Sequence, residues 1–115
     1  MAKERLLVVD DEQDFVTAVA ARLELRGFTV TKAFNGKEGL EKARAEKPDA
    51  IILDVRMPEM SGFEVCKILK SDENCKEIPV IMLTGKSEPE DVKISKEIGA
   101  DAYFIKPFDL DTLLY

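Results

Sequence analysis

The sequence predicts an α/β domain built on a doubly wound, five-stranded parallel sheet with helices on both faces. Strand-like and helix-like segments alternate along the whole chain. The strand-like segments at 5–10, 49–54 and 78–85 are short and nearly continuously apolar, as is typical of strands buried on both faces. The helix-like segments between them supply the crossovers that parallel strands require.

The predicted elements follow one another without a linker, a repeat or a low-complexity tract. Gly27 suits the position after the last turn of the first helix, and Asn35 and Ser61 are suitable N-caps. Pro48 breaks the second helix. The strands are expected at 5–10, 28–33, 49–54, 78–85 and 101–107. The helices are expected at 12–27, 35–48, 61–71, 87–100 and 108–115.

Right-handed crossovers leave few ways to arrange five parallel strands, and the flavodoxin-like order 2-1-3-4-5 is the common solution. Residues 1–115 are expected to form one domain of ordinary size. The last helix would have only about two turns, which is shorter than the ~11-residue average. A chain cut before a following domain and a small stand-alone protein would both look like this, and the sequence leaves the two open.

The composition excludes several classes of function. The net charge is −6, and no basic stripe suggests that this segment binds nucleic acid directly. The chain has no histidine, so the commonest general base and the commonest zinc ligand are both missing. No apolar run approaches the ~20 residues of a membrane span.

The two cysteines and the first residues indicate where the chain works. Cys66 and Cys75 are too few for a disulfide scaffold and lack CxxC spacing, so we expect reduced thiols used in packing or at the surface. The opening "MAKER" leads into only four apolar residues before two aspartates, which is not a signal-peptide pattern. We therefore expect a cytoplasmic protein.

Polar residues end four of the five predicted strands. Asp10 and Asp11 end the first, Asp54 the third, Thr84 the fourth and Lys106 the fifth. In open α/β sheets, ligands bind beyond the carboxyl ends of the strands, where the strand order reverses. With order 2-1-3-4-5 this point lies between the first and third strands, so these side chains should gather there.

The gathered side chains suggest metal-assisted phosphoryl transfer. Three close carboxylates favour a hard cation such as Mg²⁺, with Mn²⁺ left open as a substitute. An ionised Asp54 could act as nucleophile toward phosphorus, while the Lys106 ammonium and the Thr84 hydroxyl stabilise phosphoryl oxygens. Glu12 is expected to begin the first helix rather than to bind the metal, because a carboxylate suits the positive end of the helix dipole. The alternative is a set of solvated strand ends with Lys106 in a structural ion pair.

The motifs that carry these residues resemble those of the receiver domain of two-component response regulators. The resemblance runs from "LLVVDDE" through "DAIILDVRMPEMSGFEV" and "IPVIMLTG" to "GADAYFIKPF". It covers nearly the whole chain in the correct order. No single piece would suffice, but the combination is highly specific.

The resemblance implies a role for each carboxylate. Asp54 would accept a phosphoryl group and form an aspartyl phosphate. Asp11 and Asp54 would bind Mg²⁺ directly, with the backbone carbonyl of Arg56 as a third protein ligand. Asp10 would act on the metal mainly through water.

The resemblance also implies a switch. Lys106 would pair with the phosphoryl group, Thr84 would turn toward it, and Tyr103 would rotate inward in concert, changing the face around the fourth and fifth helices. By its spacing alone, Tyr103 would instead be read as a half-exposed ring on an edge strand. The bond between Lys106 and Pro107 is expected to be cis, which for proline lies only about 0.5–1 kcal/mol above trans.

Two basic residues stand where such domains vary. Arg56 is two residues after Asp54, and Lys86 is two residues after Thr84. We expect both side chains to crowd or pair across the phosphoryl group and to slow the attack of water. Gly85, next to Thr84, leaves the phosphoryl group room.

Three functions compete for this site. The leading one is a signalling switch that catalyses its own phosphorylation and slow dephosphorylation but is not a turnover enzyme. The second is a Mg²⁺-dependent phosphohydrolase with an aspartyl phosphate intermediate, but Arg56 stands where such enzymes commonly carry a general acid. The third is an interaction module that no longer uses phosphate, although Asp54, Thr84 and Lys106 are all present.

The resemblance implies two kinds of partner. The phosphoryl group would come from a sensor histidine kinase or a phosphotransfer protein, and the signal would pass to an output domain or protein. Homodimerisation through the last helix is left open. The sequence names neither the kinase nor the pathway, and it does not give the lifetime of the phosphorylated state.

Overall fold

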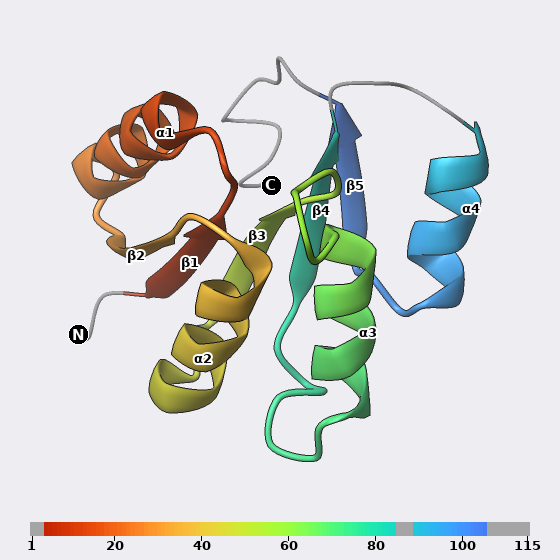
Figure 1. Cartoon of the computed structure of the whole chain (residues 1–115). Coiled ribbons are helices and arrows are strands. Elements are labelled where there is room, and N and C mark those ends of the chain that lie inside the picture. Colours follow the sequence, from red (N-terminus) through yellow and green to blue (C-terminus); the bar gives the residue numbers. More distant parts are fainter. Residues whose placement is uncertain (1–3, 85–88, 106–115) are drawn as a thin grey trace.

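The computed structural model describes residues 4–84 and 89–105, and it contains a five-stranded, all-parallel sheet. The strands lie in the order β2-β1-β3-β4-β5, and all the arrows in Figure 1 point the same way. The predicted strand order is therefore confirmed. The strands are β1 (Arg5–Val9), β2 (Thr29–Ala33), β3 (Ala50–Asp54), β4 (Val80–Thr84) and β5 (Ala102–Ile105).

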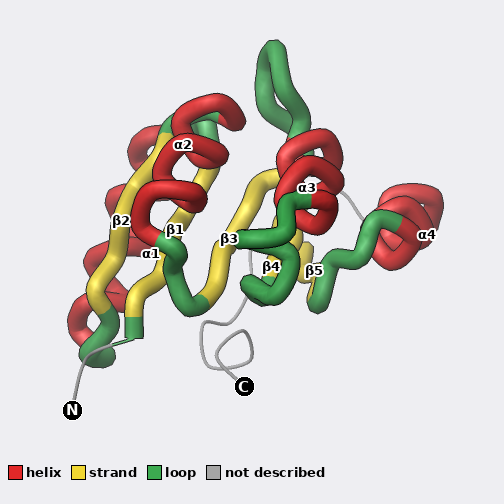
Figure 2. The backbone as a smooth tube through the Cα atoms, turned by 90° about the horizontal axis from the view of Figure 1, so that it is seen from below, coloured by secondary structure: helices red, strands yellow, loops and turns green. Residues whose placement is uncertain are grey.

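Helices cover both faces of the sheet, as predicted. The buried residues of α2 and α3 pack on one face of the sheet and those of α1 on the other, and Figure 2 shows α4 beside β5. The helices are α1 (Gln13–Leu25), α2 (Gly36–Glu46), α3 (Gly62–Ser71) and α4 (Pro89–Glu97). The predicted helix at 108–115 lies outside the described residues.

Alternation along the strands divides the core between these two faces. On β1, Leu6 and Val8 pack in the cluster that includes the buried face of α1, whereas Leu7 and Val9 pack in the cluster that includes α2 and α3. The middle strands are apolar on both faces because neighbouring residues point to opposite sides and both sides are covered. The ends of these strands are therefore where polar side chains can be placed without disturbing the core.

Most predicted element ends shift inward by one to three residues, and the backbone hydrogen bonds explain two of these shifts. The amide of Phe28 donates to the Leu23 carbonyl at 3.2 Å and helps to close α1, so β2 begins at Thr29 rather than at residue 28. The second helix ends at Glu46 rather than at 48, because Lys47 adopts a left-handed conformation with φ of 46°. Gly27, with φ of 97°, stands after the last turn of α1, as predicted.

Side-chain caps begin two of the helices, as predicted. The Asn35 side chain accepts from the Glu38 amide at 2.8 Å at the start of α2. At the start of α3, the Ser61 hydroxyl accepts from the Glu64 amide at 3.2 Å. These caps satisfy amides that have no partner within the helix.

Both cysteines are free thiols and both are buried, so they are used in core packing and not at the surface. Burial raises the pKa of the Cys66 thiol to about 11, and it also raises the pKa of Cys75. Among the described residues, no helix is long and apolar enough to cross a membrane.

Replacing Ser61 by alanine should lower the free energy of unfolding by about 1 kcal/mol, because the Glu64 amide loses its acceptor. Urea denaturation measures this change. Ser71→Ala is the matched control at the other end of α3, where the hydroxyl donates to the Lys67 carbonyl at 2.9 Å and caps nothing. Equal losses in the two variants would contradict a capping role for Ser61.

In the folded protein, Cys66 and Cys75 should react slowly with a chromogenic disulfide reagent at pH 8. With a pKa of about 11, only about one Cys66 thiol in a thousand is ionised at this pH, whereas an unfolded cysteine with a pKa near 8.5 is about one quarter ionised. Thiol release should become fast in denaturing urea. Rapid release of two thiols from the native protein would show that this part of the core opens readily.

Candidate functional site

The register of the sheet brings the ends of β1, β3 and β4 to one edge. Val9 of β1 pairs with Leu53 of β3, so the next residues, Asp10 and Asp54, lie side by side at the ends of the two strands. Asp54 in turn pairs with Leu83, which places Thr84 one residue beyond it on the neighbouring strand. The strand pairing therefore brings Asp10, Asp54 and Thr84 to the same edge of the sheet, whereas Lys106 lies outside the described residues.

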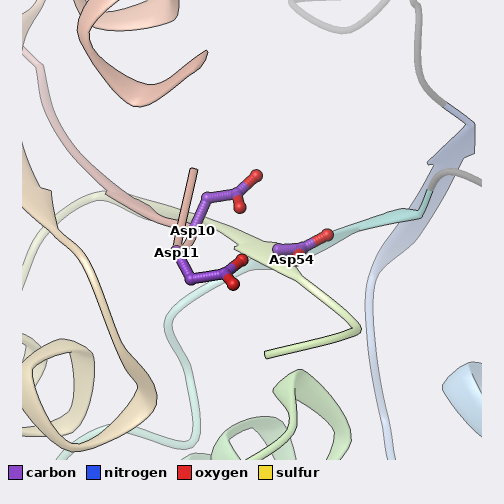
Figure 3. Close-up of side chains that lie close together, drawn as sticks. All are labelled: Asp10, Asp11 and Asp54. Carbon is purple, nitrogen blue, oxygen red and sulfur yellow. The ribbon is translucent and has the colours of Figure 1, made fainter. Parts of the chain in front are cut away.

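Three carboxylates meet at this edge. One carboxylate oxygen from each of Asp10, Asp11 and Asp54 lies within 4.8 Å of the others. Figure 3 shows the three side chains extending in the same direction from the ends of β1 and β3. Asp10 is 1% exposed and Asp54 is 5% exposed, whereas Asp11 is exposed to solvent.

Asp10 is held by the backbone around it. Its amide donates to the Ala33 carbonyl of β2 at 3.2 Å, so the pairing of β1 continues one residue past the strand. One of its carboxylate oxygens accepts from the Glu12 amide at 3.1 Å. Glu12 is the N-cap residue of α1 and is exposed, as expected for a residue that begins the helix and does not join the cluster.

The three carboxylates fit a hard divalent cation. Two like charges about 4 Å apart repel by about 1 kcal/mol in water and by more where the surroundings are less polar, so a pair of buried carboxylates beside a third is unfavourable without nearby positive charge. Carboxylate oxygens and one solvent-facing side suit Mg²⁺, which usually binds one or two carboxylates and keeps several waters. Burial of Asp10 and Asp54 and exposure of Asp11 give the cluster both a fixed wall and an open side.

The loop from β3 to α3 returns directly to Asp54. The Val55 amide donates to the Leu83 carbonyl at 2.8 Å, and the Val55 carbonyl accepts from the Gly62 amide at 2.8 Å. A Cβ atom on Gly62 would lie 2.0 Å from the Asp54 carbonyl oxygen. No role for Gly62 follows from the sequence pattern alone. The available signal was a glycine at the first position of a helix, directly after its N-cap.

The other predicted site residues are only partly described. Thr84 is buried at the end of β4, and Tyr103 is half-buried on β5, opposite Met82. Tyr103 packs against the core cluster shared with α2 and α3, so its ring is more than a surface group. Arg56 is exposed in the loop after Asp54. Lys86, Lys106 and Pro107 lie outside the described residues, and their roles stay predictions.

Known proteins are similar in sequence to this chain over nearly its whole length. A family model described as the response regulator receiver domain matches residues 6–115. The chain is 46% identical over 105 residues to the alkaline phosphatase synthesis transcriptional regulatory protein PhoP of Bacillus subtilis, covering 91% of this chain and 43% of that protein. It is 41% identical over 110 residues to protein PilH of Pseudomonas aeruginosa, covering 96% of this chain and 91% of that protein.

A solved structure agrees with the fold. The chemotaxis protein CheY4 of Vibrio cholerae matches with a TM-score of 0.92 and 38% identity, over 98% of this chain and 94% of that one. The chain spans less than half the length of four transcriptional regulators that it matches, between 43% and 48% of each. The family match, the fold and the edge of carboxylates agree: the chain belongs to the response regulator receiver domain family, the phospho-accepting switches of two-component signalling.

Proposed function

We propose that Asp54 accepts the phosphoryl group in this chain. The observation that carries the proposal is the meeting of the buried Asp54 carboxylate with those of Asp10 and Asp11 at the switch point of the sheet. A carboxylate oxygen of Asp54 attacks phosphorus, and the bond between phosphorus and the donor atom breaks. The product is an aspartyl phosphate on Asp54, and the natural donor is the phosphohistidine of a kinase or a phosphotransfer protein.

Mg²⁺ is the proposed cofactor, and Mn²⁺ a substitute. Asp11 and Asp54 would hold it directly, together with the backbone carbonyl of Arg56, and Asp10 would act through water. Asp10 suits the indirect role because one of its oxygens already accepts from the Glu12 amide. When bound, the ion offsets the repulsion among the carboxylates and the negative charge of the incoming phosphoryl group.

The chain's own side chains complete the switch. Lys106 would pair with the phosphoryl oxygens, and the buried Thr84 hydroxyl would donate to one of them. Phosphorylation adds about −1.5 to −2 charge at this edge. Thr84 lies at the end of β4, and the half-buried Tyr103 lies on the adjacent strand. A shift of Thr84 would therefore be passed to the face around Tyr103, α4 and the predicted helix at 108–115.

The partners follow from this chemistry. A sensor histidine kinase or phosphotransfer protein would supply the phosphoryl group, and an output domain or protein would read the altered face. Residues 1–115 would act as one receiver domain in the cytoplasm. Homodimerisation, the cis bond between Lys106 and Pro107 and the role of the last helix stay predictions, because they depend on residues outside the described ranges.

Family membership favours the switch over the phosphohydrolase. The chain itself would catalyse only its phosphorylation and a slow hydrolysis of the aspartyl phosphate. Arg56 stands two residues after Asp54, where a hydrolase of this chemistry would need a proton donor, and an arginine side chain stays protonated throughout the physiological range. The second half-reaction therefore lacks its acid.

Acetyl phosphate with Mg²⁺ should add one phosphoryl group to the chain, seen as a mass increase of the intact protein. Asp54→Asn should abolish the adduct, because the amide is not a nucleophile toward phosphorus, and removal of Mg²⁺ by a chelator should suppress it. Asp49→Asn, in the exposed turn before β3, is the matched control and should be modified normally. Steady release of phosphate from organic phosphomonoesters would instead support the hydrolase.

The effect of Asp11→Asn on the free energy of unfolding should change sign when Mg²⁺ is added. Without divalent ions, the variant should be more stable than the wild type by about 1 kcal/mol, because one of three close charges is removed. With Mg²⁺ at about one hundred times its Kd, the wild type should gain about 2.7 kcal/mol while the variant gains much less. Urea denaturation at constant ionic strength measures both.

Asp14→Asn is the control for this inversion, because Asp14 is an exposed acid in the first turn of α1. Its neutralisation should lower stability slightly with or without Mg²⁺, since a carboxylate there interacts favourably with the helix dipole. An Asp11→Asn variant that is less stable than the wild type without Mg²⁺ would show that repulsion does not dominate the cluster.

Arg56→Ala and Lys86→Ala should each shorten the lifetime of the phosphorylated chain, if these side chains shield the phosphoryl group from water. A loss of about 1 kcal/mol from the hydrolysis barrier corresponds to a roughly fivefold faster decay. Lys76→Ala is the control, because Lys76 pairs with Glu73 at 3.1 Å in the turn after α3. Decay that is unchanged in both variants would remove the shielding role.

A further inference from the structure

The first residue of α3 touches the backbone of the proposed phosphoacceptor. A Cβ atom on Gly62 would lie 2.0 Å from the Asp54 carbonyl oxygen, 2.8 Å from the Asp54 carbonyl carbon and 3.0 Å from the Val55 Cα. These distances involve backbone atoms, which cannot turn aside as a flexible side chain can. Any residue larger than glycine would therefore have to displace the end of β3 or the start of α3.

Space, and not backbone conformation, is what requires glycine here. Gly62 is not among the glycines with positive φ, whereas Gly27 has φ of 97° and a Cβ atom on it would meet nothing within 4 Å. Gly62 could thus be replaced without strain in its own dihedral angles. The whole effect of a side chain at Gly62 would fall on Asp54 and Val55.

The close approach fixes Val55 at both of its backbone polar groups. Its amide donates to Leu83 of β4 and its carbonyl accepts from Gly62, each at 2.8 Å, and its side chain is 1% exposed. Asp54 and Arg56 are the two neighbours of Val55 in the chain. With both of these peptide groups held, the positions open to the Asp54 carboxylate and the Arg56 carbonyl are restricted.

We propose that Gly62 is a positioning residue for phosphoryl transfer, which acts by closing the β3–α3 loop onto Val55 and so sets the spacing of Asp54 and the Arg56 carbonyl. The inference rests on the function proposed above for those two groups. Gly62 itself touches neither the metal nor the phosphoryl group. Its role is to place the Asp54 carboxylate and the Arg56 carbonyl, which belong to the residues on either side of the immobilised Val55.

Gly62→Ala tests the proposal, with Gly27→Ala as the matched control. Gly27 lies between the end of α1 and the start of β2, at the amino edge of the sheet, and an alanine there is strained by the positive φ without touching the site. Both variants lose stability, so circular dichroism and urea denaturation first establish that each is folded. Calorimetric titration then gives the Kd for Mg²⁺, and acetyl phosphate gives the phosphorylation rate at saturating Mg²⁺.

Gly62→Ala should weaken Mg²⁺ binding roughly tenfold or more, as for other residues that orient metal ligands. It should also slow phosphorylation at saturating Mg²⁺, because Asp54 itself is displaced. Gly27→Ala should leave both values near those of the wild type. A folded Gly62→Ala variant with wild-type Mg²⁺ affinity and rate would overturn the proposal. A wild type that neither binds Mg²⁺ nor accepts phosphate would instead overturn the proposed function.

Amide hydrogen exchange in the wild type tests the same idea should Gly62→Ala fail to fold. If opening of the bond from Gly62 to Val55 disrupts the metal site, Mg²⁺ must slow exchange of the Gly62 amide, because the ion binds only the closed loop. The control is the Gly27 amide, which donates to Glu24 at 3.0 Å. Slowing at Gly62 that does not exceed the slowing at Gly27 would overturn the proposal.

Discussion

The repulsion among three carboxylates at one sheet edge is the constraint on which the rest of the structure depends. Asp10 and Asp54 are buried, and their oxygens lie within 4.8 Å of each other and of Asp11. Such an arrangement survives only where the surrounding backbone is rigid and where positive charge can be supplied. The sheet supplies the rigidity, and on the function proposed above Mg²⁺ and Lys106 would supply the charge. A switch built in this way responds strongly to a further negative group.

The rigidity comes from strands that are covered on both faces. Each side of β1 and β3 faces helices, so the two strands are nearly continuous in apolar residues until the edge. Helix packing reaches that edge as well, because a Cβ on Gly39 of α2 would come within 2.9 Å of the Val9 side chain, directly before Asp10. The acidic residues therefore extend from strand ends that are held rigidly. Their close spacing follows from the strand register rather than from their own interactions.

The sequence was sufficient for the fold and for the meeting of Asp10, Asp11 and Asp54, because both follow from strand order and from polar residues at strand ends. It could not distinguish the buried Asp10 from the exposed Asp11, since both are aspartates that follow the last residue of β1 and differ only in how the packed structure covers them. It also could not find the role of Gly62, which depends on a contact between backbone atoms of two elements. The periodicity of a sequence indicates which face of an element a residue occupies. It does not indicate how closely the backbones of two elements approach each other in the packed structure.

A hydrogen-bond network around Lys70 joins the amino ends of β4 and β5 to α3. At the amino end, the Lys70 ammonium donates to the Ile78 carbonyl at 2.9 Å and to Asp101 at 3.0 Å, and the same Asp101 oxygen accepts from the Val80 amide at 2.8 Å. This network ties α3 to both strands, and its lysine is largely buried although Asp101 is half exposed. Thr84 ends the same strand at the opposite, functional edge. A strand anchored at its amino end can change position at its carboxyl end without sliding as a whole, and the switch proposed above from Thr84 to β5 would need such an anchor.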